Sequence, residues 1–157
     1  MQIIAATLAH LDGILRLSSD LNTHHAGLRP DSFRPAEASR AWITRVIESG
    51  DSDVLVAFED GRVLGFALLD EDETPPYAMF VPYKFASLID LAVDAAHRSR
   101  GIGTALLDAA EAWAAARGLA YVELSALPEN DRAVQLYERV GFEPVKITMR
   151  RMVRTEL

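Results

Sequence analysis

The sequence predicts an α/β fold in a single domain spanning residues 1–157. Two observations lead to this prediction. Hydrophobic periodicity switches along the chain between strand-like and helix-like segments, in the order β-α-α-β-β-β-α-β-α-β. The length also suffices to bury a core without disulfides or metals, and the chain contains no cysteine. No internal repeat, low-complexity stretch or linker divides the sequence, so one domain is the economical interpretation.

Residues that favour the ends of helices and strands bound most of these elements. Thr7 suits a helix N-cap, and Pro35 and Gly50 suit the start and the end of a second helix. Asp60-Gly61 is a favoured hairpin turn. In chain order, we expect a strand over residues 2–6, helices over 8–21 and 35–49, strands over 53–58 and 62–69, a further strand ending near 93, a helix over 101–117, a strand over 121–127, a short helix over 133–140, one or two strands over 142–153, and loops over 22–34 and 70–76.

Composition argues against several classes of function. The chain has 16 Lys and Arg residues against 23 Asp and Glu residues, a net charge of −7. Binding to nucleic-acid phosphates needs excess positive charge, so nucleic acid is not an expected partner. The acidity mildly favours a cationic substrate, although it also simply keeps proteins soluble. We see no signal peptide, no apolar run near the ~20 residues of a membrane span and no spaced metal ligands, and we expect a cytoplasmic protein without membrane or metal.

The strongest local signal is a strand, a short connection and then Arg98-x-x-Gly101-x-Gly103 at the start of a helix. Unpaired backbone N–H groups and the helix dipole form an anion site there, and glycine lets phosphate oxygens approach closely. Alone, the pattern is also compatible with an ordinary helix start beside two solvated arginines. A P-loop would need Gly-Lys-Ser/Thr, and a dinucleotide fingerprint would need a third glycine where Leu106 stands.

Two stretches of this sequence resemble the GNAT superfamily of N-acetyltransferases. The segment from Ile89-Asp90-Leu91-Ala92-Val93 to Arg98-Ser99-Arg100-Gly101-Ile102-Gly103-Thr104 is similar to that family's acetyl-CoA motif and its preceding strand. The segment Asn130-Asp131-Arg132-Ala133-Val134-Gln135-Leu136-Tyr137-Glu138-Arg139-Val140-Gly141-Phe142 is similar to the family's Asn-x-x-Ala-x-x-Leu-Tyr-x-x-x-Gly-Phe segment. Ser99 departs from the pattern, because many members have glycine there.

The resemblance implies a mixed, mostly antiparallel sheet flanked by helices, with splayed central strands. It also implies an N-acetyltransferase that moves an acetyl group from acetyl-CoA to a primary amine by direct attack on the thioester. Backbone amides of the Arg98–Thr104 loop would hold the pyrophosphate, and the strand ending at Val93 would hydrogen-bond pantetheine and steady the oxyanion. The implied cofactor-binding residues are Leu91, Val93, Arg98, Arg100, Gly101, Ile102, Gly103, Thr104 and Asn130.

Two of the implied roles have structural alternatives. Tyr137 matches the family tyrosine that protonates the departing thiolate, which a phenol can do at neutral pH. It also shares an apolar helix face with Ala133 and Val140, as a core tyrosine would. Asn130 matches a position that contacts the cofactor, and an N-cap would explain it equally well.

The general base is open at this stage. Asp90 and Glu123 lie on the strands expected to splay, and His24 and His25 lie in the early loop; a water chain without any single base is a further option. An alternative function is an inactive module of the same fold that binds or senses acetyl-CoA.

The acceptor is expected to be a small-molecule or peptide amine. In the family's layout the acidic run Asp70-Glu71-Asp72-Glu73 would be a loop near the acceptor, which would favour cationic amines. The final strands are candidates for pairing across a homodimer interface.

Overall fold

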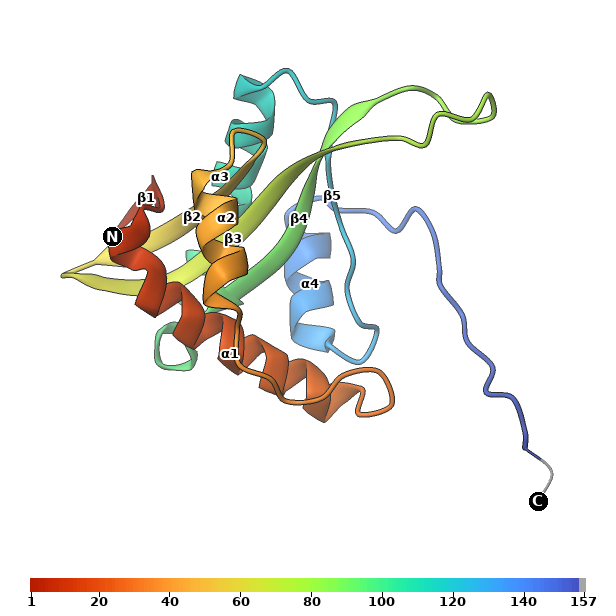
Figure 1. Ribbon diagram of the computed structural model, residues 1–157, viewed down its shortest axis with the longest axis horizontal. Coiled ribbons are helices and arrows are strands. Elements are labelled where there is room, and N and C mark those ends of the chain that lie inside the picture. Colours follow the sequence, from red (N-terminus) through yellow and green to blue (C-terminus); the bar gives the residue numbers. More distant parts are fainter. Residues whose placement is uncertain (156–157) are drawn as a thin grey trace.

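A five-stranded sheet with helices on both faces forms the frame of the molecule (Figure 1), and the computed structural model describes residues 1–155. The strand order is β1-β2-β3-β4-β5; β1 to β4 pair antiparallel, and β5 runs parallel to β4. This mixed sheet confirms the fold class expected from the sequence. The elements are β1 Gln2–Ala5, α1 Leu11–Leu28, α2 Arg40–Glu48, β2 Ser52–Glu59, β3 Arg62–Glu73, β4 Lys84–Val93, α3 Ile102–Ala116, β5 Val122–Leu124 and α4 Asp131–Arg139, with 3-10 turns at Leu8–His10 and Ala95–His97.

Alternating side chains of the central strands supply a separate core on each face of the sheet. On one face Val54, Val56, Phe66 and Leu68 pack with apolar residues of α1 and α2. On the other face Leu55, Ala57, Ala67 and Leu69 pack with Ile102, Leu106 and Ala110 of α3. Both faces of β2 and β3 are therefore buried, which explains why these strands read as nearly continuous apolar runs.

The strands β4 and β5 splay, as expected, although β5 is the edge strand of the described sheet. Their parallel pairing covers only Ala86 to Leu88 of β4, which lie opposite Val122 to Leu124. The strand β4 then continues for five residues, paired only with β3. A β-bulge marks the point of divergence, because Leu88 pairs with Leu69 and Asp90 with Leu68, which leaves Ile89 as the extra residue. Bulges bend a strand and redirect its side chains, which is common beside active sites.

The boundaries of the first two helices were predicted wrongly. Thr7 caps the short 3-10 turn, and α1 runs on through His24 and His25 to Leu28, so the expected loop begins later. The helix α2 begins at Arg40, with Ser39 as N-cap, rather than at Pro35.

Side chains of α1 explain the late start of α2. The hydroxyl of Ser19 accepts a hydrogen bond from the Ala38 amide at 3.0 Å, and the amide of Asn22 donates to the carbonyl of Ala36 at 3.0 Å. These bonds hold residues 36–38 in a non-helical conformation along α1, because side-chain partners compete with helical ones for backbone groups.

Two further expectations were wrong. The acidic run 70–73 is not a loop, because it forms the end of β3 and pairs with residues 84–87 of β4. The expected final strands over 142–153 are not paired with any strand among the residues described. The alternation in that segment is real, but the chain runs outward from the end of α4 (Figure 1), where no strand of the same chain lies beside it.

Candidate active site

The loop that precedes α3 has the backbone geometry of an anion site. Ser99 and Gly101 both adopt left-handed conformations, with φ of 64° and 78°. The first backbone bond of α3 runs from the Ala105 amide to the Gly101 carbonyl at 3.0 Å, so the amides of Ile102, Gly103 and Thr104 precede the helical hydrogen-bond pattern. Gly101 stands at the N-cap and supplies no side-chain acceptor. These amides are left available to an external anion at the positive end of a 15-residue helix.

A buried carboxylate anchors the loop from below. Asp94 is 6% exposed and accepts hydrogen bonds from Arg16 at 3.0 Å and Arg62 at 3.1 Å. The amide of Ala96 also donates to it at 3.0 Å. Burial would raise the pKa of Asp94, but these donors outweigh that effect and the pKa is lowered, so the carboxylate stays charged. The loop is thereby fixed to α1 and β3 before it reaches the glycines.

Three arginines lie around the loop, and the sequence pattern indicated only two of them. Arg98 is exposed, and Arg100 forms an ion pair with Glu59 at 3.3 Å. The third is Arg132 of α4, which donates a hydrogen bond to the Ser99 hydroxyl at 3.2 Å. Arg132 stands two residues after Asn130 in the second GNAT-like segment. Nothing in that segment indicated that α4 would bring this arginine to the phosphate loop.

Gly103 has a packing role in addition to the expected one. A Cβ atom at this position would lie 2.9 Å from a terminal carbon of Leu136, closer than real Cβ contacts. Glycine therefore lets the first turn of α3 approach α4. A larger residue here would disturb helix packing as well as any phosphate contact.

The splayed end of β4 provides an open strand edge. Leu91 and Val93 pair with Ala67 and Gly65 of β3 on one side. On the other side β5 has already ended its pairing at Leu88, so the backbone of residues 89–93 faces the gap between the strands. This edge leads toward the start of α3. The backbone of Leu91 and Val93 is therefore followed along the chain by the amides of the loop before α3.

Three titratable groups from three elements are electrostatically coupled at this gap. Burial raises the pKa of Asp90 on β4, and the neighbouring His25 of α1 partly opposes the rise. Burial and then the charge of Asp90 raise the pKa of Tyr137 on α4. Burial and then His24 lower the pKa of His25, against the effect of Asp90. The fold thus brings Asp90, His25 and Tyr137 together from positions far apart in the sequence.

The other candidate bases lie elsewhere. Glu123 pairs in register with Ser87, whose hydroxyl donates to Asp72 at 3.2 Å, and Glu123 acts electrostatically on Tyr121 rather than on Tyr137. His24 is exposed on α1. Neither is coupled to Tyr137.

Asn130 and Tyr137 also have the structural roles that were considered for them. The Asn130 side chain caps α4 by accepting from the Ala133 amide at 3.4 Å. The ring of Tyr137 packs edge-on against Phe142, with ring centres 5.9 Å apart. Tyr137 is only partly buried, however, and no residue of α4 is fully buried. These contacts position both residues without requiring that this be their only role.

Carboxylates of the acidic run 70–73 already bind partners within the fold. Asp70 accepts from the Ser52 hydroxyl at 2.7 Å, and Glu71 pairs with Arg117 at 2.7 Å. Glu73 lies 3.6 Å from Lys84. These carboxylates belong to the end of β3 that pairs with the start of β4, so the reason for expecting them to attract a cationic acceptor is lost.

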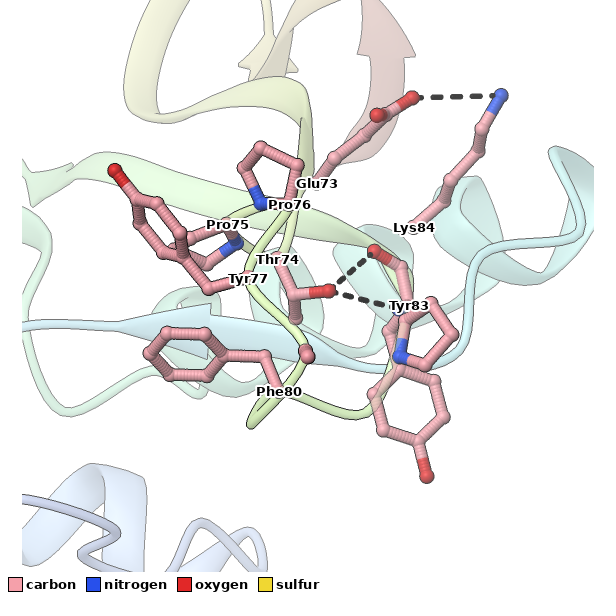
Figure 2. A pocket seen from close by; sticks show the side chains of 10 residues that line it. Glu73, Thr74, Pro75, Pro76, Tyr77, Phe80, Tyr83 and Lys84 are labelled. Atoms are coloured by element: carbon pink, nitrogen blue, oxygen red, sulfur yellow. Dashed lines mark hydrogen bonds and ion pairs between the residues drawn. The ribbon is translucent and has the colours of Figure 1, made fainter.

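The connection between β3 and β4 forms a separate concave surface. This hollow has a volume of about 710 Å³ and is lined by residues between Glu73 and Lys84. Figure 2 shows the side chains that line it. The Thr74 hydroxyl holds it together through a hydrogen bond to the Val81 carbonyl and one from the Tyr83 amide, both 3.0 Å. No residue that the sequence singled out for the cofactor lines it. Tyr77 and Phe80, which line it, are 67% and 40% exposed, so it is an open apolar surface outside the gap.

Comparison with known proteins agrees with this geometry. The model of the acetyltransferase (GNAT) family matches residues 17–142, which include the α3 loop, the splayed strands and α4. The chain belongs to the GNAT family of acetyltransferases. An uncharacterised N-acetyltransferase of Methanocaldococcus jannaschii is 32% identical over 107 residues, which are 68% of this GNAT chain and 46% of that protein. The chain thus spans about half the length of this relative.

Solved structures share the GNAT fold over nearly the whole chain. A variant of the BH1408 protein of Bacillus halodurans has a TM-score of 0.92 and 25% identity, over 98% of this chain and all of that one. An aminoglycoside N-acetyltransferase solved in complex with CoA has a TM-score of 0.69 and 20% identity, over 98% and 100% of the two chains. Within residues 1–155, no helix combines the length and the apolar character that crossing a membrane requires.

Proposed function

We propose that this protein transfers an acetyl group from acetyl-CoA to a primary amine by direct attack of the amine on the thioester. One observation carries the proposal: the edge of β4 that β5 leaves unpaired beyond Leu88 holds Asp90, whose charge reaches Tyr137 of α4, and it runs on toward the glycine loop before α3. Membership of the GNAT family supports acetyl transfer. The CoA bound to the aminoglycoside acetyltransferase of the same fold supports the choice of cofactor.

The residues present fit the phosphate end of acetyl-CoA. The amides of Ile102, Gly103 and Thr104 would donate to pyrophosphate oxygens, and the helix dipole adds to their attraction. Arg98 and Arg132 lie beside these amides and would pair with the same charges. Ser99, where glycine is common in the family, tolerates its left-handed conformation and accepts the hydrogen bond from Arg132.

The open edge of β4 fits the pantetheine arm and the reacting carbonyl. Backbone groups near Leu91 and Val93 would pair with the amides of the arm as a neighbouring strand does. A backbone N–H near Val93 would donate to the carbonyl oxygen as negative charge develops there. Bound acetyl-CoA supplies the thioester whose carbonyl carbon the amine attacks.

Asp90 is the group best suited to take a proton from the substrate ammonium. It lies on the same strand as Leu91 and Val93, immediately after the bulge at Ile89. Its raised pKa makes it a stronger base than an ordinary aspartate while leaving it able to ionise. His25 is adjacent, and its lowered pKa keeps it neutral at physiological pH, so it would not repel an incoming ammonium.

Tyr137 would return a proton to the departing thiolate. Its raised pKa keeps the phenol protonated at neutral pH, as an acid must be before the reaction. It comes from α4, a different element from the strand that holds Asp90, and the charge of Asp90 acts on it. A base and an acid on the two walls of one gap would let the proton enter from the amine and leave with the thiol.

A thiol-release assay with a panel of amines tests the proposal. We expect CoA to form only when both acetyl-CoA and an acceptor amine are present, and calorimetric titration to show acetyl-CoA binding in the absence of amine. Binding without release for any amine would support an acetyl-CoA-binding module instead. Absence of both binding and release would contradict the cofactor assignment itself.

A further inference from the structure

The connection between β3 and β4 exposes a group of large apolar side chains. Tyr77, Met79 and Val81 are 67%, 82% and 62% exposed. They stand on a hairpin that projects from the sheet, at the upper right of Figure 1. Apolar side chains that gather on a surface are costly in water and mark sites of interaction.

Backbone hydrogen bonds hold this hairpin in a defined shape. The Thr74 amide donates to the Tyr83 carbonyl and the Phe80 amide to the Tyr77 carbonyl, both at 3.0 Å. The rings of Tyr77 and Phe80 lie near each other, with centres 6.4 Å apart. The hollow of about 710 Å³ therefore exists before a partner arrives, and little ordering entropy is lost on binding.

The residues of the hollow favour contact with another protein through side chains. Pro75, Pro76 and Pro82 line it and carry no N–H group, so this part of the hairpin cannot recruit a strand by backbone pairing. Tyrosine and phenylalanine are enriched at protein interfaces, and Tyr77 and Phe80 supply them here. Small ligands are usually enclosed on most of their surface, which this open hollow does not provide.

A second, acidic hollow adjoins the first one. It has a volume of about 250 Å³ and is lined by Asp51, Glu71, Asp72, Glu73 and Lys84, of which the last two also line the apolar hollow. Arg117 pairs with Glu71, and Lys84 lies beside Glu73. Asp51 and Asp72 are exposed and form no ion pair with any residue in 1–155. A partner with a positive charge next to an apolar side chain would complement both hollows.

These hollows lie away from the gap that holds the proposed acetyl-transfer site. Lys84 begins β4, and Asp90 follows six residues later on the same strand. At the rise of a β-strand, six residues span about 20 Å. A small acceptor amine beside Asp90 would therefore not reach the hairpin, and a ligand of the hairpin need not be the acceptor.

We propose that the β3–β4 hairpin docks a basic segment of a partner protein. An apolar side chain of that segment enters the hollow lined by Tyr77 and Phe80, and a neighbouring arginine or lysine pairs with Asp51 and Asp72. The negative charges that attract this partner repel anionic surfaces, so they also provide specificity.

Hexapeptides that contain no amine test the docking apart from acetyl transfer. The probes are acetylated at the N-terminus, amidated at the C-terminus and built from leucine, phenylalanine, serine, arginine and glutamate. Fluorescence polarisation should show binding to peptides that place arginine beside leucine or phenylalanine, and this binding should weaken in high salt. Replacing arginine by glutamate, or the apolar residue by serine, should abolish it. Peptide binding without these preferences, or none at all, would overturn the proposal.

Two matched pairs of substitutions locate the binding surface. Tyr77→Ser alters a side chain that lines the hollow, and Met79→Ser alters a more exposed one on the same hairpin that does not line it. Asp51→Asn removes an exposed charge of the acidic hollow, and Asp108→Asn removes an exposed charge of α3. We expect peptide affinity to fall roughly 10-fold for Tyr77→Ser and by about threefold to fivefold for Asp51→Asn, with neither control changed. Equal effects within both pairs would refute the assignment.

Two other occupants of the surface give different results with the same variants. Sedimentation with vesicles of phosphatidylcholine and phosphatidylglycerol, lost in Tyr77→Ser, would assign the hairpin to a membrane. Light scattering that shows a dimer for the wild type and a monomer for Tyr77→Ser would assign it to a second copy of the chain. Either result would overturn docking of a basic segment.

Discussion

The two parts of this molecule, residues 1–114 and residues 115–155, differ in how completely their side chains are buried. The first part buries apolar side chains on both faces of the sheet, and Val54, Val56 and Phe66 are fully buried. The second part contains a strand of three residues and a helix of nine, neither with a buried residue. The first part therefore holds the buried cores of the molecule, whereas the second part packs against them without a buried residue of its own.

The candidate site lies on the border between these parts. The β4 edge and the start of α3 belong to the well-packed part, while Tyr137 and Arg132 belong to the other. The β4 edge and the start of α3 therefore come from the part with buried residues, and α4 comes from the part without them. Any ligand that contacts both parts will stabilise both against unfolding, and the effect on the second part will be the larger share of its own stability, because none of its residues is buried.

The largest expected effect tests the difference in burial directly. Phe66→Ala should lower the free energy of unfolding by about 3–5 kcal/mol, because it opens a cavity in a fully buried core. Phe142→Ala should cost only about 1 kcal/mol, since its ring is partly exposed. Urea unfolding of both variants and of the wild type, at the same protein concentration, gives the two losses. Equal losses would mean that the second part has a core of its own.

The next largest effect concerns the proposed base. Asp90→Asn should lower kcat/KM by roughly 10²-fold or more, because an amide cannot accept the proton. The rise of kcat/KM with pH should have its midpoint above the ordinary carboxyl range, as the raised pKa of Asp90 requires, and this limb should vanish in the variant. His25→Gln is the matched control. Loss of the limb in that variant, with retention in Asp90→Asn, would assign the base to His25.

The same substitution has a distinguishing effect on stability. Because burial raises the pKa of Asp90 in the folded chain, the folded state holds its proton more tightly than the unfolded state does. Stability from this group is therefore greatest at low pH and declines as pH rises from the unfolded pKa through the raised folded pKa. At neutral pH Asp90→Asn should unfold at the same or a higher temperature while losing activity. A purely structural aspartate would give the opposite result in thermal melts.

The wall formed by α4 is tested by removing one hydroxyl. Tyr137→Phe should reduce turnover by roughly 10²-fold with little change in acetyl-CoA affinity, because only the proton donor is lost. Tyr121→Phe is the control, since Tyr121 also has a raised pKa but stacks on Phe85 away from the gap. Steady-state kinetics and calorimetry separate the two effects. Equal turnover in both variants would leave Tyr137 with only its packing against Phe142.

The sequence predicted the elements of residues 1–114 better than it predicted which residues meet at the candidate site. Periodicity and glycines located β2, β3 and α3 closely, because both faces of the sheet bury alternating apolar residues there. The start of α2 was placed too early, because its boundary depends on bonds from Ser19 and Asn22 of α1. Asp70 to Glu73 were assigned to a loop because charge is usually exposed, whereas pairing with Arg117 and Lys84 accommodates them in a strand.

Within the site, local motifs and long-range contacts differed in how far they could be predicted. The pattern Arg98-x-x-Gly101-x-Gly103 is local, so its helix start followed from the sequence. The grouping of Asp90 with His25 depends on α1 lying across β4, which no spacing reveals. The strands expected after Phe142 are not formed among the described residues, because an alternating pattern alone supplies no neighbouring strand to pair with.

The smallest expected effect concerns Arg132, which reaches the phosphate loop from the less buried part. Arg132→Gln removes a charge that hydrogen-bonds Ser99 and would face the pyrophosphate. The residue is exposed, so we expect a loss of about 1 kcal/mol, or roughly fivefold in KM for acetyl-CoA, with kcat unchanged. High salt should shrink the difference, because screening acts on exposed charges. Arg139→Gln, on the last turn of the same helix, is the charge-matched control. If both variants raise KM equally and with the same salt dependence, Arg132 contributes only to the general field of α4, and the two walls meet at the loop through Gly103 and Leu136 alone.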